Sequence, residues 1–146
     1  MTVYFDLCSL QRPSDDRTQP RVRAEAEAVL ALLAAVSIGR LRLIWSDVLD
    51  DEAGRNSDPD RRRVVEDVRD LAEQVIGLTA DIGADAGRLV AAGLGPFDAL
   101  HLASATAAGV EYFCTCDDRL VKRGRAIHTP PPWIVTPVEL VDEIKP

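Results

Sequence analysis

Short apolar runs alternate with stretches of helical periodicity along this chain of 146 residues, and this alternation limits the folds open to it. Four of the runs are typical of strands, at residues 2–6, 41–45, 111–115 and 133–135. Between them, apolar residues recur at the three- and four-residue spacing of helices. Strands that alternate with helices pair in parallel, and the helices cover both faces of the sheet. The sequence therefore predicts one α/β domain over residues 1–146 with a mostly parallel sheet.

Capping residues mark where the helices are expected to begin. Side-chain oxygens accept hydrogen bonds from the free N–H groups of a first turn, and proline suits the first helical position. By these signals, helices are expected to start at or next to Pro20, Ser46, Asp58, Thr79, Pro96 and Thr136. The helix after Asp58 is expected to continue to Ile76, whereas residues 7–19 are expected to form a polar loop. Residues 117–125 are expected to form a short helix or turn.

The composition is that of a folded protein with an acidic surface. Hydrophobic residues make up 47% of the chain, which argues against disorder. The net charge is −7, from 24 acidic and 17 basic residues. This balance weighs against nucleic-acid binding through overall charge. It does not exclude a nuclease, because local basic patches can flank an acidic pocket that holds a metal.

Three observations indicate a protein of the reducing cytoplasm without a membrane segment. Met1 and Thr2 lead directly into a strand-like run, without the basic stretch of a secretory signal. No apolar run approaches the roughly 20 residues that a membrane span needs. Cys8, Cys114 and Cys116 are an odd number and lack the spacing of a disulfide framework. With only two histidines beside them, a zinc site is disfavoured, and Cys114 and Cys116 are expected to be buried thiols.

Acidic residues recur where strands are expected to turn into helices or loops. Asp6 ends the first strand, Glu52 follows the second, Asp98 opens a helix and Asp117 follows the third strand. The carboxyl ends of parallel strands face one crevice, where these acids can converge. Converging carboxylates repel one another unless a cation lies between them, and oxygen ligands suit Mg²⁺ or Mn²⁺. The pattern predicts a divalent-metal site and a hydrolase that acts on phosphodiesters.

The acids stand in sequence motifs that are similar to those of a known family. The segment from Gly95 to Ala103 contains Asp-Ala-Leu-His-Leu-Ala, and Thr115-Cys-Asp-Asp-Arg-Leu120 follows the next strand. Together with Asp6-Leu-Cys-Ser-Leu-Gln-Arg-Pro13 and the segment from Ser46 to Glu52, these motifs cover nearly the whole chain. In this order and at these spacings, the chain resembles the PIN-domain family, and within it the VapC-like toxin ribonucleases.

This resemblance implies a fold, an activity and partners. It implies a three-layer α/β/α sandwich and a ribonuclease that depends on Mg²⁺ or Mn²⁺, typical of the toxin in a type II toxin–antitoxin pair. Carried over by position, the metal ligands are Asp6, Glu52, Asp98 and Asp117, with the Thr115 hydroxyl near the metal. A small antitoxin protein and a homodimer are also implied, with RNA as the substrate.

The sequence departs from the family pattern at three places. Leu7 and Cys8 occupy the usually small or polar stretch after the first acid, where Ser9 could supply a hydroxyl instead. Asp51 adjoins Glu52 and Asp118 adjoins Asp117, so either neighbour could replace the named acid.

Several other residues have a structural and a functional interpretation. His101 is expected to be a half-buried helix histidine bonded to backbone or to Asp98, with contact to metal-bound water or RNA as the alternative. Trp133 is expected in the core. Arg61, Arg62 and Arg63 are expected on a solvated helix face. The basic residues better placed for phosphate follow Asp117, namely Arg119, Lys122, Arg123 and Arg125. Arg12 and Arg17 follow Asp6 and could also reach the substrate, and their structural interpretation is a surface loop tied by Asp15 or Asp16.

Rival functions make different demands on the sequence. A receiver-type phosphoacceptor domain needs a lysine after a late strand, and neither Lys122 nor Lys145 is placed there. A haloacid-dehalogenase-like phosphatase needs Asp-x-Asp after the first strand, and Asp6-Leu7-Cys8 lacks it. The remaining alternative is a catalytically inactive PIN-like module for binding or regulation, and metal-dependent cleavage separates it from the nuclease.

Overall fold

A single parallel sheet forms the centre of the molecule. The computed structural model describes residues 1–145. Its five strands are β1 (Thr2–Phe5), β2 (Arg42–Ser46), β3 (Gln74–Ile76), β4 (Tyr112–Cys114) and β5 (Trp133–Val135). They lie in the order β3-β2-β1-β4-β5, and every neighbouring pair is parallel. The predicted mostly parallel sheet is confirmed.

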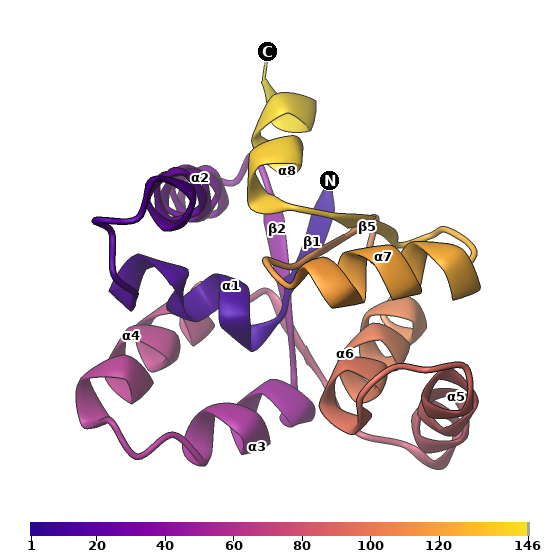
Figure 1. Cartoon of the computed structure of the whole chain (residues 1–146). Coiled ribbons are helices and arrows are strands. Elements are labelled where there is room, and N and C mark those ends of the chain that lie inside the picture. Colours follow the sequence, from indigo (N-terminus) through magenta and orange to yellow (C-terminus); the bar gives the residue numbers. More distant parts are fainter. Residues whose placement is uncertain (146) are drawn as a thin grey trace.

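Helices cover both faces of this sheet and make the α/β/α sandwich. The helices are α1 (Leu7–Gln11), α2 (Pro20–Ser37), α3 (Asp47–Gly54), α4 (Pro59–Arg69), α5 (Ala80–Ala91), α6 (Pro96–Ala107), α7 (Asp118–Ile127) and α8 (Pro137–Ile144). Figure 1 shows α1, α2 and α4 on one side of the sheet and α5, α6 and α7 on the other. Helix α8 packs beside α2. Within residues 1–145, no helix has the length and hydropathy needed to cross a bilayer.

The expected capping residues begin the helices in the structure. Ser46 Oγ accepts a hydrogen bond from the N–H of Leu49, and Thr79 Oγ1 accepts one from the N–H of Ile82. Thr136 and Glu139 form a capping box at α8. These local bonds satisfy first-turn N–H groups that have no partner inside the helix, which is why the N-termini could be read from the sequence.

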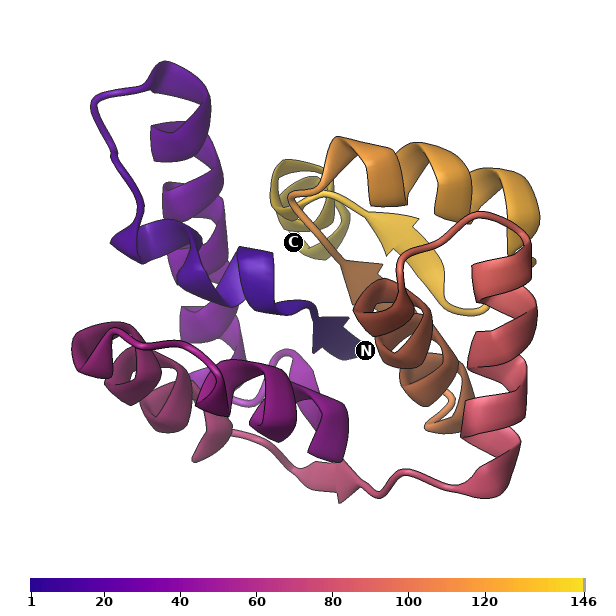
Figure 2. The same cartoon turned by 60° about the horizontal axis from the view of Figure 1, so that its bottom comes forward.

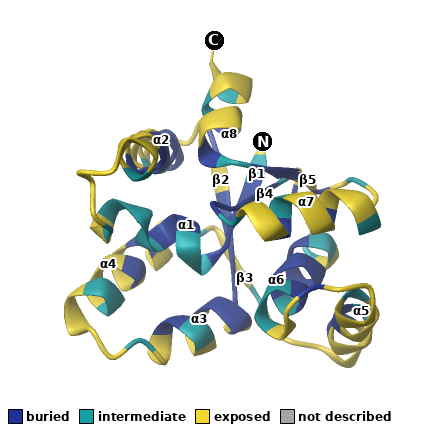
Figure 3. Ribbon diagram, viewed as in Figure 1, coloured by how far each residue is buried: buried dark blue, intermediate teal, exposed yellow. Residues whose placement is uncertain are grey.

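The central strands are buried on both faces. Val3, Tyr4 and Phe5 of β1 are inaccessible to solvent, as is Phe113 of β4. Figure 3 shows this buried sheet enclosed by helices whose outer faces are exposed. Consecutive buried residues are characteristic of a parallel strand covered by helices on both sides.

Two expected boundaries were wrong. The helix after Asp58 was expected to reach Ile76, but α4 ends at Arg69, and Gln74–Ile76 forms β3 beside β2. Strand pairing gives the backbone of this segment partners on β2, and Val75 and Ile76 are β-branched. The expected loop at residues 7–19 contains α1 and the 3₁₀ turn Arg12–Ser14. A helix of five residues is too short to show periodicity.

The expectation that Trp133 lies in the core was also wrong. Its side chain is 60% exposed. Trp133 begins β5, which has a neighbouring strand on one side only because it forms an edge of the sheet. The apolar run therefore identified the strand correctly, but not its place at the edge.

The strand order creates a crevice at the centre of the sheet. Strands β1 and β4 are neighbours, but the chain continues from β1 to β2 on one side and from β4 to β5 on the other. The two connections diverge, and ligands of open α/β sheets bind at such a switch point. Figure 2 shows α1 leaving the end of β1 toward α2, away from α5, α6 and α7.

Candidate active site

All four acids from the sequence motifs line one cleft at this switch point. The cleft has a volume of about 250 Å³, and its walls include Asp6, Glu52, Asp98 and Asp117. Asp6 follows β1, Glu52 belongs to α3, Asp98 to α6, and Asp117 precedes α7. The fold thus brings together side chains that are up to 111 residues apart, from Asp6 to Asp117.

Asp6 is held tightly at the base of the cleft. It caps α1, since its Oδ1 accepts a hydrogen bond from the N–H of Ser9 at 3.1 Å. Thr115 Oγ1 donates to Oδ2 at 2.5 Å, and the Cys8 thiol lies 3.1 Å from both oxygens. Burial raises the pKa of Asp6, whereas the hydrogen bonds from Thr115, Cys8 and Ser9 lower it. The side chain is 4% exposed, so its orientation is determined by these partners.

Thr115 connects two of the acids. Its hydroxyl oxygen donates to Asp6 and also accepts a hydrogen bond from the N–H of Asp117 at 3.0 Å. Asp117 caps α7, because its Oδ1 accepts from the N–H groups of Arg119 and Leu120. Only Oδ1 of Asp117 takes part in these bonds, which leaves Oδ2 available to a ligand in the cleft.

Asp98 has a different environment from the other acids. It lies in the first turn of α6, and within residues 1–145 its carboxylate has no hydrogen bond or ion pair. Burial, followed by the negative charges of Asp6 and Asp117, raises the pKa of Asp98 to about 6. These charges show that the carboxylates are close enough to repel one another.

Glu52 is bound through a chain of buried side chains. Its Oε1 lies 3.0 Å from Nε2 of His101, and His101 Nδ1 lies 2.6 Å from the hydroxyl of Tyr4. The same hydroxyl is 2.6 Å from Ser46 Oγ. Burial raises the pKa of the Tyr4 phenol, so the hydroxyl remains a donor.

If the imidazole of His101 is neutral, only one assignment of donors and acceptors satisfies this series of hydrogen bonds. The Glu52 carboxylate can only accept, so His101 Nε2 donates to it and His101 Nδ1 accepts from Tyr4. Tyr4 then accepts from Ser46, whose oxygen also accepts from the N–H of Leu49. The bonds run from the start of α3 through β1 and α6 to Glu52, and they orient its carboxylate.

His101 was expected to be half-buried and bonded to backbone or to Asp98, which was wrong. It is 1% exposed and bonds to Tyr4 and Glu52. Sequence reasoning missed Tyr4, although a tyrosine inside an apolar strand needs a partner for its hydroxyl.

The contact of Cys8 with Asp6 was a second feature that the sequence motifs did not predict. Its thiol lies against the Asp6 carboxylate, whereas Ser9 Oγ donates to the carbonyl of Cys114, away from the acids. The hydroxyl that reaches Asp6 comes from Thr115. Cys114 and Cys116 are buried, as expected.

The two neighbouring acids lie elsewhere. Both oxygens of Asp118 are 2.7 Å from the guanidinium of Arg21, and the carboxylate is 71% exposed. Asp51 pairs with Arg55 at 3.2 Å. Neither residue lines the cleft.

The cleft has the donor chemistry of a divalent-metal site. Within residues 1–145, no lysine or arginine forms an ion pair with Asp6, Asp98 or Asp117, so their charges are not balanced by the protein. Four carboxylates suit a hard cation such as Mg²⁺ or Mn²⁺. The four acids line the same cleft. Among the described residues, however, no three histidine, cysteine or acidic side chains already stand in metal-ligating positions.

Comparison with known proteins places this geometry in a family. A family model described as the PIN domain matches residues 16–126. This range contains Glu52, Asp98, Thr115 and Asp117, while Asp6 precedes it. No curated protein matches the chain.

A solved structure shares the fold. It is the crystal structure of VapBC2 from Rickettsia felis bound to a DNA fragment from their promoter, with a TM-score of 0.56 and 14% sequence identity. The alignment covers 92% of this chain and 97% of that one. Since the family model covers most of the chain and the observed sandwich is the fold that the resemblance implied, the protein belongs to the PIN-domain family.

Proposed function

We propose that the protein is a metal-dependent ribonuclease that hydrolyses phosphodiester bonds of RNA, and that it acts as the toxin of a type II toxin–antitoxin pair. PIN domains are generally nucleases. The observation that carries the proposal is the cleft itself, in which four carboxylates from four elements meet and three lack a cationic partner among the described residues. Such a charge arrangement is costly without a ligand and suited to a cation.

Asp6, Glu52, Asp98 and Asp117 would hold Mg²⁺ or Mn²⁺. The bound ion would supply an activated water and stabilise the charge that builds on the phosphoryl oxygens. The protein's part is to place the carboxylates. Thr115 fixes Asp6 relative to the start of α7, and His101 fixes Glu52 relative to the sheet. Asp98 has no hydrogen-bond or ion-pair partner among residues 1–145, so its side chain can turn toward the ligand.

The partners and location belong to the same proposal. The structurally similar VapBC2 protein was solved in a complex with promoter DNA. By analogy, we expect a small antitoxin protein, a homodimer of this chain and a cytoplasmic location. Co-expression with the product of the adjacent reading frame, followed by size-exclusion chromatography, tests the first two expectations.

A cleavage assay tests the activity. Purified protein is incubated with a panel of fluorogenic RNAs in Mn²⁺, Mg²⁺ or EDTA, next to Asp98→Asn and the control Asp118→Asn. We expect cleavage only with metal, abolished by Asp98→Asn and retained by Asp118→Asn, since Asp118 lies outside the cleft. Cleavage that survives Asp98→Asn contradicts the site.

The alternative is a catalytically inactive PIN-like module that binds or regulates. It is favoured by the absence of preformed metal-ligating positions among residues 1–145. Failure to cleave any RNA in the panel, together with an unchanged melting temperature in Mn²⁺, supports this module over the nuclease.

A further inference from the structure

A second and larger cavity adjoins the acidic cleft. It has a volume of about 580 Å³ and lies between α7 and the turn that joins α5 to α6. Asp98 and Asp117 line both spaces, so the cavity continues from the cleft. Beyond these two acids, its walls carry Arg119, Lys122 and Arg123.

None of these three cations has a hydrogen-bond or ion-pair partner among residues 1–145. Of its 17 lysines and arginines, all but four donate a side-chain hydrogen bond or form an ion pair among the described residues. The exceptions are Arg63, Arg119, Lys122 and Arg123. Three of these four exceptions line a single cavity, and the fourth, Arg63, lies outside it.

The spacing of the three residues places them together. Arg119 and Lys122 are three residues apart on α7, and Arg123 is four residues from Arg119, so their side chains share a face of the helix. This face starts with Arg119, two residues after Asp117, which caps the helix. The wall of the cavity that α7 forms therefore carries Asp117 first and the three cations after it.

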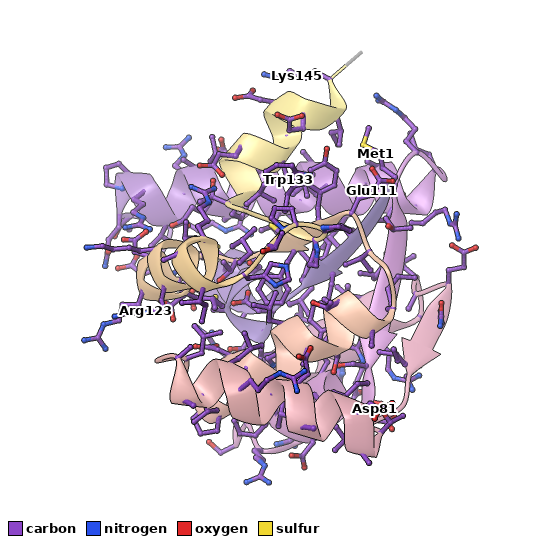
Figure 4. All side chains as sticks on the ribbon, turned by 90° about the vertical axis from the view of Figure 1, so that its right-hand side faces the viewer. Met1, Asp81, Glu111, Arg123, Trp133 and Lys145 are labelled. Atoms are coloured by element: carbon purple, nitrogen blue, oxygen red, sulfur yellow. The ribbon has the colours of Figure 1, made fainter. Side chains whose placement is uncertain are left out.

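The backbone opposite α7 leaves room for Arg123. A Cβ at Gly93 would lie 3.2 Å from Arg123 Nε and 3.5 Å from Cζ. Gly93 also has a φ of +114°, which disfavours other residues. Arg123 thus lies against the turn between α5 and α6, on the side of α7 that faces α5 (Figure 4).

We propose that this cavity binds backbone phosphates of RNA next to the phosphodiester that is hydrolysed. The inference rests on the proposed function, because the cleft that shares Asp98 and Asp117 with the cavity would receive the scissile phosphate. Cationic side chains that contact phosphates position a nucleic acid without reading its sequence. The cavity explains how a chain with a net charge of −7 holds a polyanion, since the attraction is local.

Binding without metal tests the inference independently of catalysis. The full-length protein is titrated in EDTA against a 5′-fluorescein 12-nucleotide RNA, and anisotropy is recorded over a series of NaCl concentrations. Arg123→Gln, and the triple variant Arg119→Gln, Lys122→Gln and Arg123→Gln, are compared with Arg63→Gln. Arg63 is a matched control because it is an unpaired cation outside the cavity.

We expect Arg63→Gln to bind like the wild type and the triple variant to bind at least tenfold more weakly. Each lost contact should reduce the slope of log K against log salt by about 0.7, the value for single strands. Equal binding by all variants, or no RNA binding by the wild type, overturns the inference and leaves the nuclease proposal to the cleavage assay. If the triple variant loses RNA binding but the wild type cleaves no RNA, the phosphate-binding cavity is supported and the nuclease proposal is contradicted.

A competitor distinguishes phosphate from carboxylate ligands. Oligoglutamate of the same length is added to the RNA complex of the wild type. We expect it to displace the RNA only at concentrations far above those of unlabelled RNA. Displacement at equal concentration shows an acidic-peptide site instead and overturns the inference.

Discussion

At the scale of single residues, Asp98 is the acid least supported by the protein. Asp6 accepts three hydrogen bonds and Asp117 caps a helix, whereas the described residues provide no hydrogen bond to Asp98. A carboxylate that is buried near like charges is destabilising when ionised. Its pKa of about 6 lies above the value of an unfolded chain, so it favours the fold at low pH, and this contribution is lost as the pH rises through about 6.

Asp98→Asn should therefore stabilise the metal-free protein at neutral pH. After allowance for solvent screening of this half-buried group, we expect a gain of about 1 kcal/mol above pH 6. The gain should shrink as the pH falls and approach zero only below the ordinary aspartate pKa of 3.8, where Asp98 is protonated in both states. Urea denaturation in EDTA at several pH values measures it.

Asp81→Asn is the control for this change, because Asp81 also lies in a helical first turn but outside the cleft. It should not stabilise the protein. A loss of stability in Asp98→Asn at pH 7 contradicts the assigned repulsion.

Tyr4 is the second residue with a specific role. Tyr4→Phe keeps the ring stacked on Phe113, with centroids 5.6 Å apart, but removes the hydroxyl that joins Ser46 to His101. Leaving buried partners unsatisfied costs about 1–3 kcal/mol, which a urea midpoint shift measures. Tyr112→Phe on the neighbouring strand is the control, since no described residue bonds to that hydroxyl. Equal effects of the two substitutions would contradict the assigned chain of hydrogen bonds.

At the scale of elements, two helical glycines illustrate how packing decides the effect of a substitution. Gly87 on α5 has open space where a Cβ would stand, whereas at Gly124 on α7 the Cβ would lie 2.5 Å from Ile134 Cδ1. Alanine favours a helix by about 1 kcal/mol over glycine, and overpacking a core costs about 1–3 kcal/mol. The absence of a side chain at residue 124 therefore allows α7 to pack closely on β5.

Gly87→Ala should raise stability by up to about 1 kcal/mol, while Gly124→Ala should lower it. Ile134→Val removes the clashing Cδ1, so the double variant should be more stable than the sum of the single effects predicts. Thermal denaturation of the four proteins measures this coupling. Additive effects would show that α7 and β5 do not meet at this contact.

At the scale of the whole molecule, the cleft gathers parts of β1, α3, α6 and α7. A cation that binds all of these parts in the folded state, and not in the unfolded chain, stabilises the entire fold. The effect depends on the positions of the strands, because no two of the four acids belong to one element.

Mn²⁺ at about 100 times its dissociation constant should stabilise the wild type by roughly 2.7 kcal/mol. For a protein of this size, that is a rise of several degrees in the melting temperature, since each kcal/mol is worth roughly 2–4 °C. Asp6→Asn should lose most of the rise. An equal rise in both proteins would indicate a metal site elsewhere.

The sequence alone determined the features that depend on neighbouring residues. The four apolar runs that were assigned to strands do form strands, and Ser46, Thr79 and Thr136 begin helices, because these signals act within a few residues. The motifs also identified the four acids that line the cleft. The short strand Gln74–Ile76 was not predicted, because only its pairing with β2 distinguishes it from the end of a helix.

The tertiary structure alone decided which distant groups meet. The order β3-β2-β1-β4-β5 places the ends of β1 and β4 side by side, and no local pattern encodes that order. Tyr4 reaches His101 and Thr115 reaches Asp6 across 97 and 109 residues. The exposure of Trp133 follows from the position of β5 at the edge. These features result from packing the whole chain into one core, because burial and long-range hydrogen bonds exist only once the strands have assembled.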